Sequence, residues 1–192
     1  MGKSKIIISV LVVLIIASLS FFLLSNKEPM LNDIHTHADV MVFLDGAEFD
    51  LAQQKYMSKG NLTLSPFVHL HDADGDIIHK HIKGVTLDEF FTTLGMDFSK
   101  ECFITDNKKE YCNNAEKKVV MLVNGKENKK FGNYEFKDLD RILIYYGSDD
   151  KTLINGLMQQ VTDKACIQSG KCPERGIPYN ESSCTTEGGC TA

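Results

Sequence analysis

The sequence has no C-x-x-C motif and no histidine outside a His-x-His pair, although it holds six cysteines and six histidines. A thioredoxin-like redox site needs C-x-x-C beside a strand and a helix, so a catalytic redox role is disfavoured. Positively charged residues are also fewer than negatively charged ones, at 21 against 26. The formal net charge is −5, and because residues 1–27 hold three lysines and no acid, the remaining chain carries −8. This acidity argues against nucleic acid or an anionic lipid surface as a partner.

Charge is absent from residues 6–24, an apolar run that follows Lys3 and Lys5. About 18 or more apolar residues can span a bilayer as a helix. A cleavable signal segment has a shorter apolar core and an A-x-A-like site, so residues 1–27 are predicted to be an uncleaved N-terminal transmembrane anchor. The two lysines keep the N-terminus cytoplasmic, which predicts a single-pass protein of the cell membrane whose main domain is extracytoplasmic.

Cysteine is missing before residue 102, so all six cysteines lie on the predicted outer side. They are Cys102, Cys112, Cys166, Cys172, Cys184 and Cys190. Disulfides persist in oxidising compartments, and the even count agrees with that location. Cys102 and Cys112 flank a hairpin centred on Asn107, which predicts a local disulfide. The last four cysteines allow three pairings, and the spacing does not choose between them.

The histidines form three pairs. They are His35 with His37, His69 with His71, and His79 with His81. The alternation of polar and apolar residues around them predicts that each pair lies on a strand, where residues i and i+2 point to the same side. Each pair therefore directs both rings to one spot. The segment 67–81 is predicted to be a hairpin whose Val68, Leu70 and Ile78 point away from the histidines, toward a core.

Two registers of this hairpin remain open. With Gly75 at its centre, His71 faces His79 and His69 faces His81. A three-residue loop over 73–75, with Gly75 left-handed, places His69 opposite His79 instead. Both registers keep the four rings on one face of the hairpin, whereas a slip by one residue would divide them between two faces.

Imidazole nitrogens gathered in this way are ligands for Zn²⁺ or Cu²⁺. The predicted metal site comprises His35, His37, His69, His71, His79 and His81, with Asp39 available from the first strand. Calcium is disfavoured, because the acidic stretch 72–76 lacks the spacing and the terminal glutamate of an EF-hand. No motif supplies a general base or a substrate pocket, so binding ranks above catalysis and the catalytic residues are unknown.

The pattern predicts an α+β fold with a mixed sheet and one packed helix that begins after Thr86. The stretch VVMLVNGK followed by NYEFKDLDRILIYYG is similar to the last two strands of a β-grasp domain. Four segments are expected: the anchor at 1–27, a His-rich α+β domain at 28–147, a helix at 148–164, and a Cys-rich tail at 165–192. The tail is nearly without apolar residues, so it depends on its own cross-links for order.

The motifs HTHADVMVFLDG, FVHLHDADGDIIHKH, GVTLDEFFTTLGM and DKACIQSGKCPERG resemble an uncharacterised family of archaeal and bacterial membrane-anchored extracytoplasmic proteins, some of them classed as disulfide-isomerase-like. The family implies no established chemistry, and the missing C-x-x-C departs from an isomerase. The sequence thus predicts a membrane-anchored Zn²⁺- or Cu²⁺-binding protein. The alternatives are a metal-dependent hydrolase, a thiol–disulfide isomerase-like enzyme, and a disulfide-stapled interaction module without metal. No protein partner is indicated.

Overall fold

The computed structural model describes residues 2, 33–58, 64–178, 184–185 and 189–190. The predicted anchor at 1–27 lies outside these residues, apart from Gly2, and stays a prediction. Among the described residues, no helix has the length and apolar character needed to cross a membrane. All elements below belong to the unit that begins at Asp33.

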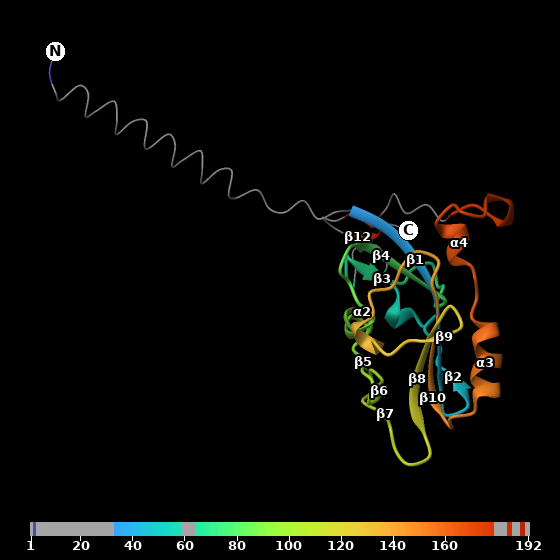
Figure 1. Cartoon of the computed structure of the whole chain (residues 1–192). Coiled ribbons are helices and arrows are strands. Elements are labelled where there is room, and N and C mark those ends of the chain that lie inside the picture. Colours follow the sequence, from blue (N-terminus) through green and yellow to red (C-terminus); the bar gives the residue numbers. More distant parts are fainter. Residues whose placement is uncertain (1, 3–32, 59–63, 179–183, 186–188, 191–192) are drawn as a thin grey trace. The chain divides into compact units, whose positions relative to one another are not determined.

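A seven-stranded mixed sheet forms the centre of this unit (Figure 1). Its central strands are β1 (Asp33–Leu44) and β10 (Arg141–Gly147), which pair in parallel. On the outer side of each central strand lies an antiparallel neighbour, β4 (Ile77–Ile82) beside β1 and β8 (Lys118–Val123) beside β10. The edges are β3 (Val68–His69) and β9 (Lys126–Glu127), and β2 (Ala47–Glu48) pairs with the end of β1. The expected α+β fold with a mixed sheet is confirmed.

The larger core lies on the face of the sheet that carries the even-numbered side chains of β1. Ala38, Val40 and Val42 are buried there, because successive strand residues point to opposite faces. Helix α2 (Leu87–Thr93) covers this face with its apolar Leu87, Phe90 and Phe91. Thr86 accepts from Glu89 N and forms a capping box with that residue, as expected for the predicted helix start.

A second sheet of three short strands completes the same core. Its strands are β5 (Asp97–Phe98), β6 (Cys102–Ile104) and β7 (Glu110–Cys112). Phe103 at its centre is fully buried, and its ring meets Phe91 of α2 at 5.1 Å between centroids. Figure 1 shows α2 and this small sheet on one side of the main sheet and the C-terminal helices on the other.

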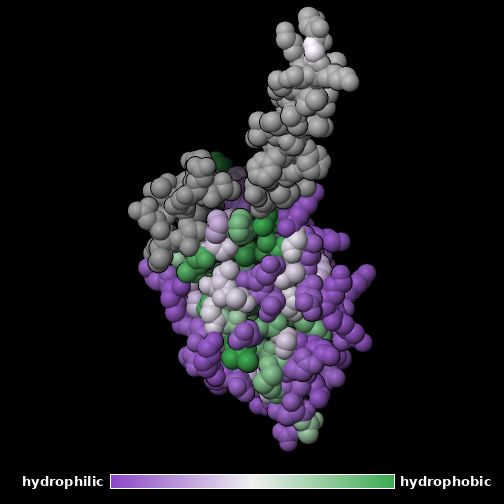
Figure 2. Space-filling view, turned by 90° about the vertical axis from the view of Figure 1, so that its left-hand side faces the viewer, coloured by the Kyte–Doolittle hydropathy of each residue, from purple (hydrophilic) through white to green (hydrophobic). Residues whose placement is uncertain are grey.

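The opposite face of the main sheet is covered by α3 (Lys151–Gln160). Its Ile154, Leu157 and Met158 pack on Leu143 and Tyr145 of β10. The helix predicted from Ser148 to about Lys164 is therefore present but shorter, with Asp150 as its N-cap residue. Figure 2 shows the other side of the molecule, which carries α2 and the small sheet, with a central band of intermediate and hydrophobic side chains bordered by hydrophilic ones.

The remaining described elements are short. They are the 3-10 turns η1 (Gln54–Tyr56), η2 (Phe131–Asn133) and η3 (Pro173–Arg175), the helix α4 (Ala165–Gln168), and the strands β11 (Cys184–Thr185) and β12 (Gly189–Cys190). Helix α4 lies within the predicted tail, yet its Ala165 is fully buried. The first part of that tail therefore packs against the sheet, close to β1.

Candidate metal centre

Three strands bring the histidines together. In the sheet, His79 of β4 has two cross-strand partners, His37 on β1 and His69 on β3. Because directly opposed residues share a face, all three rings lie on the same side, the side covered by α3 and α4. Val68, Leu70 and Ile78 belong to the core on the other side, as predicted. The hairpin thus adopts the register that places His69 opposite His79.

The turn of this hairpin differs from the one expected. Asp72 and Ala73 are the left-handed residues, with φ of 56° and 57°, and Gly75 is not left-handed. A Cβ atom on Gly75 would lie 2.6 Å from the carbonyl carbon of Leu51 and closer still to the backbone nitrogen of Ala52. Glycine is therefore needed at this position for close approach of two backbones, not for a positive φ.

The six rings form one continuous cluster. Neighbouring ring centroids are separated by 3.9 Å for His71 with His79 and by 4.7 Å for His35 with His37. Three further pairs of neighbours are 4.8 Å apart for His35 with His81, 4.8 Å for His37 with His79, and 4.9 Å for His69 with His81. All six predicted histidines thus form one cluster, five of them from β1, β3 and β4 and His71 from the turn that follows β3.

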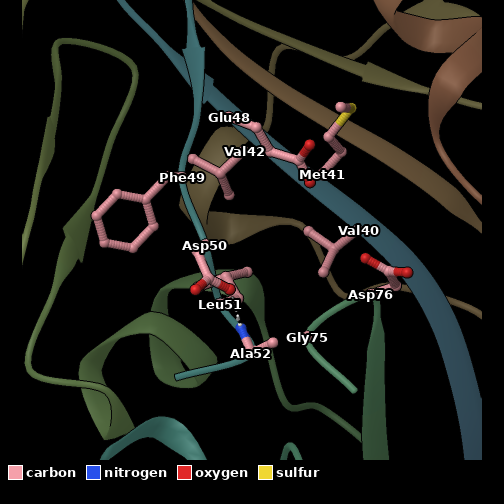
Figure 3. A pocket seen from close by; sticks show the side chains of 10 residues that line it. All are labelled: Val40, Met41, Val42, Glu48, Phe49, Asp50, Leu51, Ala52, Gly75 and Asp76. Carbon is pink, nitrogen blue, oxygen red and sulfur yellow. Dashed lines mark hydrogen bonds between the residues drawn. The ribbon is translucent and has the colours of Figure 1, made fainter. Parts of the chain in front are cut away.

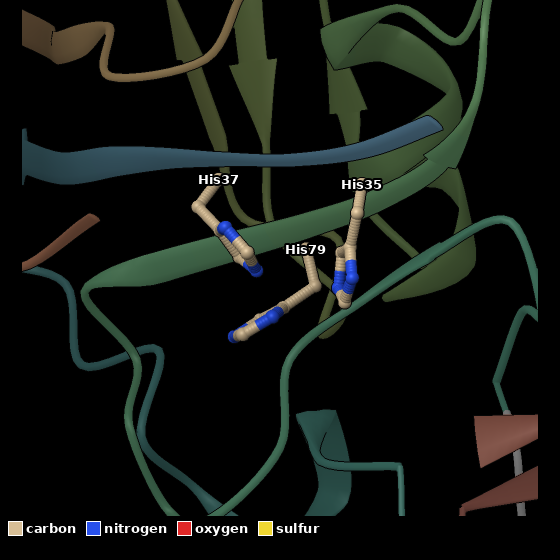
Figure 4. Close-up of side chains that lie close together, drawn as sticks. All are labelled: His35, His37 and His79. Carbon is tan, nitrogen blue, oxygen red and sulfur yellow. The ribbon is translucent and has the colours of Figure 1, made fainter. Parts of the chain in front are cut away.

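Three of these histidines have ligand atoms that converge. One ring nitrogen from each of His35, His37 and His79 lies within 4.8 Å of the other two. Figure 4 shows the three rings grouped on one side of β1 and β4. His37 and His79 are buried, at 2% and 1% exposure, whereas His35 is exposed. The cluster therefore has a buried floor and an open edge.

Hydrogen bonds behind the rings fix which nitrogen can serve as a ligand. His69 Nδ1 lies 2.9 Å from the backbone oxygen of Ser65, which can only accept, so His69 donates from Nδ1. His71 Nδ1 lies 2.5 Å from Asp72 Oδ2. In neutral rings bonded in this way the lone pair is on Nε2. Metal-binding histidines have this arrangement, with the second nitrogen donating to a carbonyl or carboxylate.

The spacing between nitrogens also suits a metal. His71 Nε2 and His79 Nδ1 are 3.2 Å apart. Two nitrogens bound tetrahedrally to zinc at about 2.0–2.1 Å would be about 3.3 Å apart. The same distance fits a hydrogen bond between the rings.

Asp39 has a different environment from the histidines. Its carboxylate is buried and accepts three hydrogen bonds, from Thr162 Oγ1 at 2.5 Å, Lys164 N at 2.7 Å and Ala165 N at 3.1 Å. Burial is the main cause that raises the pKa of Asp39 above its usual value. Its observed role is to hold residues 162–165 on β1, and its role as a metal ligand stays a prediction.

The acidic tip of the hairpin is paired with a cation of the chain. Lys164 Nζ lies 2.5 Å from Asp76 Oδ2 and 3.5 Å from Asp74 Oδ2. The hydrogen bond with Asp76 is the main cause that raises the pKa of Lys164. Carboxylates paired with a lysine and with His71 are arranged unlike a calcium loop, where they surround the ion.

Two disulfides are formed among the described cysteines. Cys102 is bonded to Cys112, as predicted, across the register pair of β6 and β7. Cys166 is bonded to Cys172, which selects one of the pairings left open for the tail. None of the four described thiols is free. The backbones of Cys184 and Cys190 are register partners in β11 and β12, but their side chains lie outside the described part.

A cavity of about 300 Å³ lies beside the hairpin tip (Figure 3). It is lined by β1 residues 40–42, by residues 48–52, and by Gly75 and Asp76. Of the described residues that line it, none is a histidine. The cavity therefore shares no residue with the three-histidine cluster and is not a substrate pocket for it.

Sequence reasoning missed the residues that support the rings. Ser65, Asp72 and Ser169 each place an oxygen within hydrogen-bond distance of a histidine Nδ1. Asp72 and Ser65 are near their histidines in sequence and could have been considered. Ser169 is 132 positions from His37, and no pattern in the chain links the two.

Comparisons with known proteins add no family to this geometry. No family model, no curated protein and no solved structure matches the chain. The function of this protein is therefore inferred from its own site.

Proposed function

We propose that this protein binds a transition-metal ion, Zn²⁺ or Cu²⁺, in the histidine cluster of β1, β3 and β4. The observation that carries the proposal is the convergence of ring nitrogens from His35, His37 and His79. Three imidazoles at one point match the ligand set that both ions prefer. His69, His71 and His81 lie next to these three, and we propose that their ring nitrogens are available as further ligands.

The supporting hydrogen bonds strengthen this proposal. A polar surface that merely happened to use histidine would not need a fixed tautomer at three of its six rings. Here Ser65, Asp72 and Ser169 each bond an Nδ1 atom. Such bonds orient the rings with Nε2 directed away from the partner, and they raise the basicity of a ligand.

Metal binding or transfer is favoured over catalysis. His35 is exposed, while His37 and His79 are buried, so an ion could enter and leave at one edge of the cluster. The described cavity of about 300 Å³ is lined by no described histidine. A hydrolase would need a substrate position beside the ion, and this cavity does not provide one among the described residues.

Metal analysis of the full chain, purified without a histidine tag or chelator, tests the proposal. We expect about one or more Zn or Cu per chain, and loss of stoichiometric binding in His35→Ala/His79→Ala. Thr36→Ala is the matched control, because Thr36 lies between His35 and His37 and points to the opposite face. An absence of metal from the wild-type chain after incubation with both ions would refute the proposed function.

We also propose that residues 6–24 anchor the protein in the membrane with the histidine domain outside. The uncharged apolar run after Lys3 and Lys5 supports this location. The two disulfides agree with an oxidising compartment. Protease added to intact cells should then remove the histidine domain. Full protection until the membrane is opened would contradict the orientation.

The finer fold assignment is a proposal of the same kind. We infer a β-grasp arrangement from the parallel pair of β1 and β10 at the centre, the antiparallel neighbours β4 and β8, and the packing of α2 on one face. Membership in the membrane-anchored family is proposed with it, on the His-x-His and TLDEFF motifs.

A further inference from the structure

We infer that Ser169 and Asp138 are positioning residues of the metal site and that the disulfide Cys166–Cys172 holds Ser169 in place. This inference rests on the proposed function, because it concerns the affinity of the same histidine cluster for its ion. Ser169 Oγ lies 2.8 Å from His37 Nδ1 and 2.5 Å from Asp138 Oδ1. The tail of the chain thus reaches a buried ring of the central strand.

The protons in this chain of hydrogen bonds can be assigned. An ionised carboxylate has no proton to donate, so Ser169 donates its single hydroxyl proton to Asp138. Ser169 Oγ must then accept from His37, which places the proton of His37 on Nδ1. The lone pair of the neutral ring is on Nε2, the nitrogen on the other side of the ring from Ser169. Asp138 and Ser169 together therefore select the ligand form of His37.

Asp138 is itself fixed relative to His37. Its Oδ1 accepts from the backbone nitrogen of His37 at 3.1 Å, and Leu139 N donates to the backbone oxygen of His37 at 2.8 Å. Backbone and side chain of one histidine are thus both tied to the segment 138–139. The result is a closed loop of hydrogen bonds that leaves the ring little freedom to rotate.

Ser169 is held by the short loop that the disulfide closes. It lies between Cys166 and Cys172 and follows directly after α4. Ser169 N donates to Ala165 O at 2.9 Å, and Lys171 N donates to Cys166 O at 2.8 Å. At the first residue of α4, Ala165 N donates to the buried carboxylate of Asp39. The loop is therefore attached to β1 at two neighbouring points, Asp39 and His37.

Removal of such a hydrogen-bond partner behind a metal ligand typically lowers metal affinity about 10- to 100-fold. We expect this loss for Ser169→Ala, because His37 can then rotate or move its proton to Nε2. Ser169→Thr keeps the hydroxyl and should restore affinity to within a few-fold of wild type. Cys166→Ser/Cys172→Ser should weaken binding in the same direction, since it releases the loop that carries Ser169.

The test is a competition titration of the full chain with Zn²⁺ and a chromophoric chelator, together with electron paramagnetic resonance of bound Cu²⁺. The matched control is Cys102→Ser/Cys112→Ser, which removes the other disulfide, in the small sheet on the opposite face. This control should bind Zn²⁺ as the wild type does. The Cu²⁺ spectrum should change in Ser169→Ala and return in Ser169→Thr, which a purely structural role of Ser169 would not produce.

Two outcomes separate this inference from the proposed function. If the wild-type chain binds Zn²⁺ or Cu²⁺ but Ser169→Ala binds it with equal affinity and an unchanged Cu²⁺ spectrum, the positioning role is wrong and the proposed function stands. If Ser169→Thr fails to restore the affinity lost in Ser169→Ala, the hydroxyl is not the group that acts and the inference is overturned. A wild-type chain that binds neither ion removes the basis of both.

Discussion

At the scale of single residues, the shape of the histidine hairpin depends on the lack of a Cβ atom at Gly75. Gly75 lies against the backbone of Leu51 and Ala52, where a Cβ atom would collide with main-chain atoms that cannot rotate away. The hairpin tip is therefore seated on the segment after β2. Its charged residues Asp74 and Asp76 are then in reach of Lys164.

Gly75→Ala is accordingly expected to destabilise the protein by about 1–3 kcal/mol, the usual cost of forcing extra atoms into a packed site. Gly156→Ala is the matched control, because nothing lies within 4 Å of its added Cβ on the exposed face of α3. That variant should stabilise by about 0.5–1 kcal/mol, since alanine is a better helix former. Urea unfolding measures both, and equal effects of the two variants would contradict the close approach.

Asp106 provides a prediction of pH dependence. It accepts from Lys55 Nζ at 2.6 Å and from Tyr56 OH at 2.9 Å, and the bond from Lys55 is the main cause that lowers its pKa. A lowered folded-state pKa adds stability above the unfolded pKa of about 3.9, and this is lost as pH falls through the folded value. Asp106→Asn should therefore melt below wild type at pH 7. The gap should narrow below about pH 4, and a gap independent of pH would refute this assignment.

At the scale of elements, the parts that could be predicted are those with local signals. The signals for β1 and β4 (alternation of side chains) and for α2 (the cap at Thr86) lie within a few residues of each element. The alternation also places the histidines on one face. The contacts of Asp138 and Ser169 with His37 join positions 101 and 132 residues apart. Such pairs depend on how loops cross the sheet, which no local pattern encodes. For the same reason α4 was not expected to pack.

The hairpin of β6 and β7 carries the prediction that belongs to this scale. Cys102→Ser/Cys112→Ser should lower the free energy of unfolding by about 2–4 kcal/mol, because the disulfide restricts the unfolded chain. Metal content should stay unchanged, since these strands pack on the α2 face of the sheet and the histidines lie on the other. Denaturant unfolding gives the free energy of unfolding, and metal analysis of the same preparation gives the metal content. Loss of metal together with stability would show that the two faces are not independent.

At the scale of the whole molecule, the proposed ion would join β1 to β4, two strands that are distant in sequence. An ion that binds only the folded state stabilises it by about 2.7 kcal/mol at a concentration 100 times its dissociation constant. Saturating Zn²⁺ should therefore raise the melting temperature of the full chain, and chelation should reverse the rise. The variant His35→Ala/His79→Ala should show neither change. A similar rise in that variant would point to ion binding elsewhere.

The parallel pairing of β1 with β10 also has a consequence for the order in which the protein is assembled. It joins Val40 to Ile142, roughly 100 residues later, and such distant pairings form slowly. A chain delivered from its N-terminus presents all six histidines once residue 81 has emerged, while the strand that closes the sheet is still to come. The histidine strands would therefore be exposed to the surrounding ions before Ser169 has emerged to orient His37, so capture of the proposed ion and the final adjustment of its site would be separate events.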